Sequence, residues 1–192
     1  METKSIMIVG VGGQGSLLAS RLLGNVLLAQ DYDVKVSEVH GMSQRGGSVV
    51  TYVKYGDKVY SPVIEKGEAD AIISFEMLEA ARWLPYLKKG GKIITSTQCL
   101  SPMPVITGAA SYPENILDKI KADGIDITAV DALKLAEEAG NAKASNVVLM
   151  GVVSTKMDFD DKLWQDAIKQ CVPEKFLELN KKAFELGKKV TD

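Results

Sequence analysis

Residues 5–23 read SIMIVGVGGQGSLLASRLL, and this stretch decides the fold class. Residues 5–9 form a short, continuous apolar run, which is typical of a central strand covered on both faces. The glycine-rich segment GVGGQG follows at residues 10–15, and the apolar residues after it suit a buried crossover helix. A strand, a glycine turn and a helix in this order indicate an α/β fold with a parallel sheet.

The glycine segment places Gly10, Gly12 and Gly15 in the spacing G-x-G-x-x-G. Glycine permits a tight turn and a close backbone approach, and a helix N-terminus offers N–H groups to an anion. Together with Gly13 and Gln14, these residues form a candidate loop for a cofactor, another ligand or a partner. Taken alone, the spacing favours NAD or FAD.

The residues after the second strand argue against that interpretation. Glu38 lies near the position of a ribose-binding acid, about 20 residues past the glycine loop. A dinucleotide-binding half needs a second crossover helix next, but here residues 40–47 lead into a β-rich run. The glycines could therefore serve helix–strand packing alone, and both interpretations stay open.

Elsewhere strands alternate with helices. We expect strands near residues 34–39, 69–75, 92–96 and 125–130 and a helix over 76–91 that is ended by glycines. We also expect a hairpin whose tight turn is Gly56-Asp57. Residues 146–157 are apolar all round and suit either a buried helix or a strand. The pattern predicts one Rossmann-like α/β domain over residues 1–192. We expect a mostly parallel sheet with a β-hairpin insertion, helices on both faces, and C-terminal helices at about 160–190 packed on it.

Composition excludes several classes of protein. The 192 residues carry a net charge of −2, which gives no sign of a nucleic-acid partner. No apolar run approaches the ~20 residues of a membrane span, and the N-terminus leaves no room for a signal peptide. The two cysteines, Cys99 and Cys171, are too few for an iron–sulfur cluster, which usually takes four thiolates. We expect a cytoplasmic protein without a metal site of its own.

The segment HGMSQRGG contains the chain's one histidine. It follows the carboxyl end of the second strand, so it should lie beside the glycine loop at the same edge of the sheet. His40 could act as an acid, a base or a donor, or be a hydrogen-bonded structural histidine. Arg45 could bind a carboxylate or phosphate, or be a solvated or interfacial arginine. No catalytic pair is evident. The predicted interface or active-site wall comprises His40, Gly41, Met42, Ser43, Gln44, Arg45, Gly46 and Gly47.

GVGGQG combined with HGMSQRGGSV resembles the gamma-type component of the 2-oxoacid:ferredoxin oxidoreductase family. The resemblance spans almost the whole chain and includes Asn146 and Gly151, which match the family's Asn-x₄-Gly pattern. The loop after strand two favours the aryl-pyruvate branch of this family. Within that branch, the chain resembles the beta subunit of indolepyruvate:ferredoxin oxidoreductase.

The resemblance implies that this chain is one part of an enzyme. In the family, a large subunit carries thiamine diphosphate and the iron–sulfur clusters. The complex oxidatively decarboxylates an aryl pyruvate, passes electrons to ferredoxin and forms an acyl-coenzyme A. This chain would hold none of these cofactors and would meet ferredoxin only through the large subunit. The alternative is a self-contained oxidoreductase or other protein that binds a nucleotide, and a homodimer of the isolated chain is left open.

Overall fold

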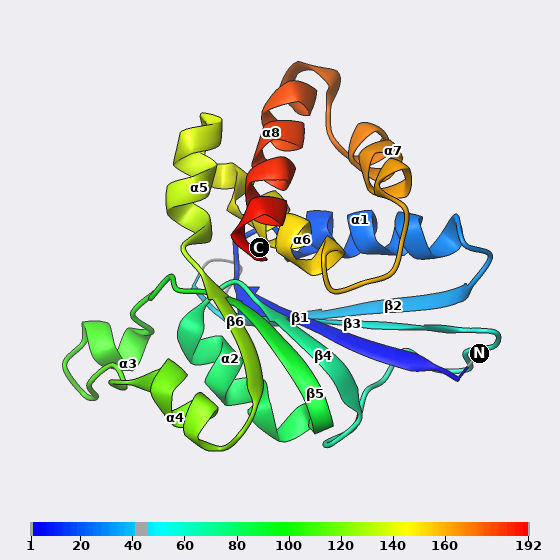
Figure 1. The fold of residues 1–192 in the computed structure, drawn as a ribbon. Coiled ribbons are helices and arrows are strands. Elements are labelled where there is room, and N and C mark those ends of the chain that lie inside the picture. The colour runs from blue at the N-terminus through cyan, green and yellow to red at the C-terminus, as the bar shows by residue number, and fades with distance from the viewer. Residues whose placement is uncertain (1, 41–45, 192) are drawn as a thin grey trace.

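The computed structural model describes residues 2–40 and 46–191, which form a mixed six-stranded sheet with helices on both faces (Figure 1). The strand order is β2-β3-β1-β4-β5-β6. The strands are β1 (Lys4–Val11), β2 (Asp33–His40), β3 (Ser48–Gly56), β4 (Ala69–Ser74), β5 (Leu87–Ser96) and β6 (Asp126–Val130). The helices are α1 (Ser16–Leu28), α2 (Met77–Trp83), α3 (Met103–Ile106), α4 (Ile116–Ala122), α5 (Ala132–Ala139), α6 (Ser145–Ser154), α7 (Asp161–Cys171) and α8 (Leu177–Lys188).

Strand β3 is the one that breaks the parallel pattern. It pairs antiparallel with β1 on one side and with β2 on the other, while β1, β4, β5 and β6 pair in parallel. The predicted α/β fold with a mostly parallel sheet, a hairpin insertion and helices on both faces is confirmed.

The predicted position of the hairpin turn was wrong. The hairpin consists of β2, which ends at His40, and β3, which begins at Ser48, whereas residues 58–68 form no strand. The physical reason is that both hydrogen-bonding edges of β3 are already occupied, so a strand after Gly56 has no edge to join. That segment is instead fastened to the start of β2, where the Val59 N–H donates to Asp33 at 2.9 Å.

The predicted helix over residues 76–91 also ends earlier than expected. Helix α2 stops at Trp83, a 3-10 turn at Leu84–Tyr86 contains Pro85, and β5 begins at once. Proline lacks the N–H that a continuing helix would need. The two glycines do not cap the helix; they lie in β5, where the register with β4 shifts and Gly90 has a φ of 80°.

Two layers of helices cover one face of the sheet and a single layer covers the other (Figure 1). Helices α1 and α6 lie on the sheet, with α5, α7 and α8 packed outside them, and α2 and α4 cover the opposite face. The apolar segment around residue 150 is therefore a helix, α6, of which nine residues are buried. Among the described residues, no helix is both long and apolar enough to cross a bilayer.

Helices α6 and α8 cross at two glycines. A Cβ added to Gly151 would lie 2.1 Å from the Phe184 carbonyl oxygen, and one added to Gly187 would lie 2.0 Å from the Val148 carbonyl oxygen. Neither oxygen can withdraw, because both belong to helix backbone. The close crossing therefore requires glycine at both positions, and it seats Phe184 and Trp164 in the core with their rings 5.8 Å apart.

We expect Gly151→Ala to destabilise the protein by about 3 kcal/mol, which lowers Tm by roughly 6–12 °C, because the added methyl group forces α8 away from α6. Gly24→Ala in α1 is the matched control, since nothing lies within 4 Å of its added Cβ. Alanine has the higher helix propensity, so the control should be as stable as the wild type or more stable by about 1 kcal/mol. Thermal and urea denaturation measure both, and equal stability of the two variants would contradict the close crossing.

Candidate functional site

The glycine loop forms the turn between β1 and α1 at the carboxyl edge of the sheet. Gly13 and Gly15 adopt positive φ angles of 99° and 87°, which side chains other than glycine rarely accept. Gly15 also lies against α6, because a Cβ there would stand 2.3 Å from the Asn146 Nδ2. Asn146 is buried and donates to the Gly15 carbonyl oxygen at 3.2 Å, so this asparagine braces the loop.

Gln14, which the sequence offered as part of a loop for a ligand or partner, turns its side chain into the sheet edge. Its Oε1 accepts from the Val11 N–H at 2.7 Å, and its Nε2 donates to the Phe75 carbonyl oxygen at 3.0 Å and to Gln98 Oε1 at 2.8 Å. The side chain thus ties the ends of three neighbouring strands, β1, β4 and β5. Both N–H donors of the amide and one acceptor position of its oxygen are therefore used within the chain.

The glycine loop and the segment after β2 are neighbours, as the sequence predicted. The Gly12 N–H donates to the Gly47 carbonyl oxygen at 2.9 Å. His40 ends β2, and Gly46 adopts a φ of 82° just before β3. The other predicted wall residues lie outside the described residues; these are Gly41, Met42, Ser43, Gln44 and Arg45.

A hollow of about 340 Å³ lies between the two loops. We call it the rim hollow; it is lined by Gly12, Gly13, Gly15, Ser16, Leu17, Glu38, His40 and Val49. Within residues 2–40 and 46–191, no side chain caps α1 at Gly15, so its first N–H groups lie beside the hollow without a side-chain partner from these residues. The exposed fraction of Leu17 is 49%, which is large for a leucine.

Glu38 supplies the acidic side of the rim hollow. Its Oε2 accepts from Ser16 Oγ at 3.4 Å and from Thr51 Oγ1 at 3.2 Å. Its Oε1 lies 3.9 Å from the Nδ1 of His40, whose side chain is 57% exposed. Glu38 therefore joins α1 to β3 through hydroxyl groups, and one of its two oxygens is engaged in these bonds. This histidine and carboxylate can exchange a proton with a bound group, and the Ser16 hydroxyl that lines the hollow beside them donates to Glu38.

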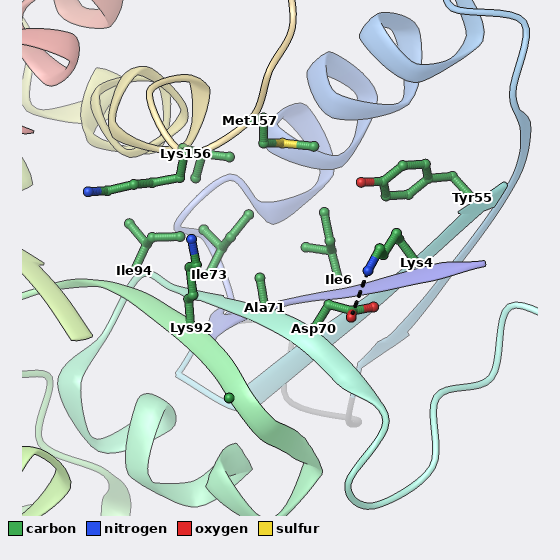
Figure 2. A pocket seen from close by; sticks show the side chains of 12 residues that line it. Lys4, Ile6, Tyr55, Asp70, Ala71, Ile73, Lys92, Ile94, Lys156 and Met157 are labelled. Atoms are coloured by element: carbon green, nitrogen blue, oxygen red, sulfur yellow. Dashed lines mark hydrogen bonds and ion pairs between the residues drawn. The ribbon is translucent and has the colours of Figure 1, made fainter. Parts of the chain in front are cut away.

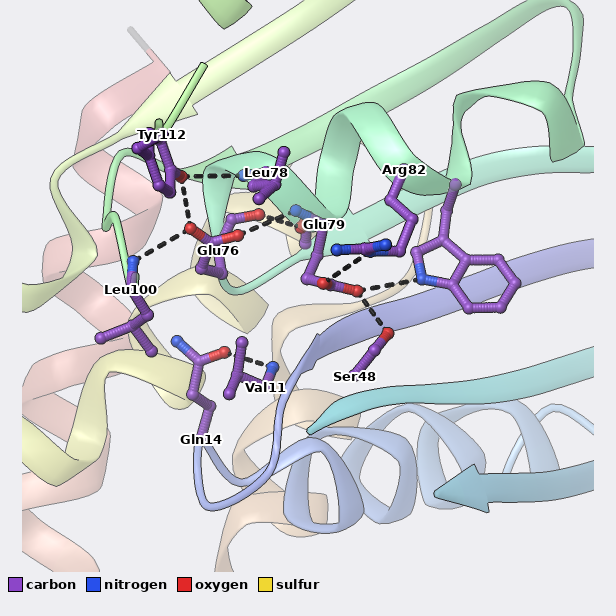
Figure 3. Close-up of polar contacts among 11 residues, drawn as sticks. Val11, Gln14, Ser48, Glu76, Leu78, Glu79, Arg82, Leu100 and Tyr112 are labelled. Atoms are coloured by element: carbon purple, nitrogen blue, oxygen red, sulfur yellow. Dashed lines mark hydrogen bonds and ion pairs between the residues drawn. The ribbon is translucent and has the colours of Figure 1, made fainter. Parts of the chain in front are cut away.

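Two buried carboxylates, Glu79 and Glu76, each hold a different segment at this edge of the sheet (Figure 3). Glu79 accepts from Ser48 Oγ at 2.5 Å, from Arg82 Nε at 2.9 Å and from Trp83 Nε1 at 3.2 Å. Ser48 is the first residue of β3, directly after Gly47. Glu79 thereby fixes the point where the segment enters the sheet.

Glu76 is the second buried carboxylate, and it holds the segment after β5. It accepts from the Glu79 N–H at 2.8 Å as the N-cap of α2, from the Leu100 N–H at 3.0 Å and from the Tyr112 hydroxyl at 2.5 Å. Burial and then the hydrogen bond to Glu76 raise the pKa of Tyr112, so its hydroxyl stays protonated and remains a donor. Sequence patterns missed both glutamates, although Glu76 and Glu79 stand three residues apart as in a helix-capping pair.

Among residues 2–40 and 46–191, no three side chains of histidine, cysteine, aspartate or glutamate gather as a metal site. Cys99 is exposed, Cys171 is half-buried, and both are free thiols. The site is thus a polar hollow with a glycine floor, an acid–histidine pair and one exposed apolar residue.

We expect Gln14→Glu to destabilise the protein by about 2–4 kcal/mol at pH 7, because a carboxylate would face the Phe75 and Gln98 oxygens without a proton to donate. The folded state then raises the pKa of the new carboxyl above its unfolded value. The stability deficit should accordingly shrink near pH 4.5 and be fully present above the folded pKa. Gln170→Glu is the control, since Gln170 uses its oxygen to accept from Asn25, and it should change stability by less than about 0.5 kcal/mol. Urea denaturation at both pH values tests this, and a deficit independent of pH would contradict it.

A family model and a curated relative both relate this chain to oxoacid oxidoreductases. The chain matches the family model of pyruvate ferredoxin/flavodoxin oxidoreductase over residues 5–190. It is 45% identical to indolepyruvate oxidoreductase subunit IorB of Thermococcus kodakarensis, over 98% of this chain and 96% of that protein.

Two solved structures share the fold. The keto/oxoacid ferredoxin oxidoreductase gamma subunit of Geobacter sulfurreducens PCA has a TM-score of 0.72 and 23% identity, and 97% of each chain is covered. The 2-oxoglutarate:ferredoxin oxidoreductase of Magnetococcus marinus, solved with 2-oxoglutarate, coenzyme A and succinyl-CoA, has a TM-score of 0.76 and 16% identity. There 99% of this chain matches 31% of a longer chain. The resemblance that the two loops suggested is confirmed, and the chain belongs to the pyruvate ferredoxin/flavodoxin oxidoreductase family.

Proposed function

We propose that this chain is the small subunit of an indolepyruvate-type 2-oxoacid:ferredoxin oxidoreductase, and that a larger subunit completes the enzyme. The observation that carries the proposal is the 45% identity to an indolepyruvate oxidoreductase subunit IorB over nearly the full length of both chains. The reaction would be the oxidative decarboxylation of an aryl pyruvate to an acyl-coenzyme A, with ferredoxin as electron acceptor.

The cofactors are assigned to the larger subunit. Two cysteines cannot supply the four thiolates that an iron–sulfur cluster usually takes. In the 2-oxoglutarate relative, the part that matches this chain is 31% of a longer polypeptide, which supports a division between this domain and a larger remainder. Thiamine diphosphate, the clusters and the contact with ferredoxin would belong to that remainder. We place the complex in the cytoplasm, where free thiols such as Cys99 and Cys171 persist.

The rim hollow is the face that we assign to the large subunit or to the wall of its active site. It combines an exposed leucine, the acid–histidine pair and glycine backbone, a mixture that suits close contact with another chain. The interactions of Gln14, Asn146 and Glu79 hold this face in shape from inside the domain, so it can be presented to a partner without rearrangement.

The isolated chain should show no turnover of indolepyruvate with ferredoxin, because it lacks the thiolates for electron transfer. Adding the separately purified large subunit should restore acyl-coenzyme A formation. Ferredoxin reduction in the presence of coenzyme A measures both. Turnover by the pure small chain would contradict the proposal, and a stoichiometric NAD or FAD spectrum from that chain would favour a self-contained nucleotide-binding protein instead.

Leu17→Asp should weaken assembly with the large subunit by roughly tenfold or more, because a charge replaces apolar contact area at the rim. The chain itself should remain stable, since an aspartate in the first turn of α1 interacts favourably with the helix dipole. Leu28→Asp is the matched control. Leu28 is 56% exposed at the other end of α1, so assembly should be unchanged while stability falls by about 0.5 kcal/mol.

His40→Ala should change the Tm of the isolated chain by no more than about 2 °C, because the His40 side chain is largely exposed. It should reduce either the affinity of assembly or the turnover of the assembled enzyme. The same result is expected from Arg45→Ala on the basis of the sequence. Thermal melts of the isolated variants, with titrations and kinetics of the reconstituted complex, separate these effects. If His40→Ala unfolds the isolated chain while the folded remainder assembles and turns over normally, the histidine is structural.

A further inference from the structure

A second cavity lies at the opposite edge of the sheet from the glycine loop. Its volume is about 290 Å³, near the lower end for small-molecule pockets, which occupy roughly 300–1,000 Å³. It opens between the amino-terminal ends of the parallel strands and the residues that follow α6 (Figure 2). Lys4 at the start of β1 lines it, whereas Val11 at the end of β1 adjoins the glycine loop. The two sites are therefore separated by the length of an eight-residue strand, about 25 Å.

The floor of this cavity is apolar. Ile6, Ile73 and Ile94 project from three adjacent strands, and each is at most 5% exposed. The small residues Ala71 and Gly90 leave the space above their strands open. An apolar floor of this kind favours a ligand with a compact hydrocarbon body.

The charged residues around the cavity leave an excess of positive charge. Asp70 is already engaged, since it accepts from the Ser5 N–H at 2.9 Å and pairs with Lys4 at 3.5 Å and Lys88 at 3.3 Å. Lys92 and Lys156 also line the cavity, and the ammonium group of neither has a hydrogen bond or ion pair to any residue that the structure describes. Figure 2 shows both on the side away from Asp70. These two ammonium groups are available to an anion.

Tyr55 supplies an unpartnered donor. Its side chain is 7% exposed and packs on Tyr32, with ring centroids 5.4 Å apart, while its hydroxyl is aimed into the cavity (Figure 2). The hydroxyl has no hydrogen-bond partner among the described residues. Burial, with the charge of Asp70 as a smaller cause, raises the pKa of Tyr55 to about 12, so the group carries its proton at neutral pH. The hydroxyl is accessible from the cavity, where an acceptor atom of a ligand could take its hydrogen bond.

We propose that this cavity binds a small organic carboxylate with an apolar body. The carboxylate lies at Lys92 and Lys156, and the apolar body covers the three isoleucines. The Tyr55 hydroxyl donates a hydrogen bond to an acceptor atom of the ligand, which can be a carboxylate oxygen. The site is separate from the rim hollow, and the inference does not depend on the function proposed for that surface.

Calorimetric titration of the full chain with phenylacetate, at low ionic strength, tests the proposal. Phenylacetate should bind saturably. Phenylacetamide has the same shape without the charge and should bind at least about tenfold more weakly, which corresponds to a loss of about 1.4 kcal/mol. Acetate and inorganic phosphate carry charge without an apolar body, and both should bind more weakly than phenylacetate.

Variants then locate the ligand. Lys92→Gln with Lys156→Gln should weaken phenylacetate binding by roughly tenfold, and Tyr55→Phe should weaken it several-fold without lowering Tm. Ala71→Leu should abolish binding by filling the cavity. Lys121→Gln, an exposed lysine on α4, is the control and should bind as the wild type does.

The proposal is overturned if phenylacetate shows no saturable binding, or if phenylacetamide, acetate or phosphate binds as tightly. It is overturned equally if the lysine pair and the Lys121 control give the same affinity. Thermal melts of every variant ensure that lost binding is not lost folding.

Discussion

The hydrogen bond from the Gly12 N–H to the Gly47 carbonyl oxygen holds the two loops of the candidate site together, and it depends on the direction of β3. Because β3 runs antiparallel between β1 and β2, its first residue pairs with the last residue of β1, Val11 with Ser48. A parallel strand in the same place would begin at the other edge of the sheet, and the 40–47 segment could not reach the glycine loop. The turn after β1 has the glycine spacing of nucleotide-binding folds. Because β3 is reversed, that turn instead forms one half of a surface made by two loops.

The fold could be predicted from the sequence wherever the deciding interactions are local. The apolar strand before GVGGQG and the alternation of strands and helices depend on neighbours a few residues apart. The hairpin turn could not be placed in this way. Gly56-Asp57 has the composition of a tight turn, but which edge of β3 is free depends on β1, which lies far earlier in the chain.

The same distinction separates what the sequence revealed of the site from what it missed. The proximity of the two loops follows from the general rule that parallel strands end at one edge. The inward orientation of Gln14 depends on Gln98, 84 residues away, and the role of Glu79 depends on Ser48, 31 residues away. The Asn-x₄-Gly pattern is similar, since Asn146 braces Gly15 while Gly151 admits the backbone of α8. The sequence shows these residue types, but it does not show which distant residues they contact.

The central position of β1 also affects how the chain emerges during synthesis. β1 is made first, yet its two neighbours in the sheet, β3 and β4, are made much later. β2 and β3 are joined by a short segment, so they can close as a local ribbon within microseconds, before the ribbon docks on β1. Until then the apolar stretch SIMIV has no partner strand, and unpaired apolar strands of this length are prone to associate with other chains. The residues that specify the fold are therefore also the ones that most need shielding while the ribosome completes the rest.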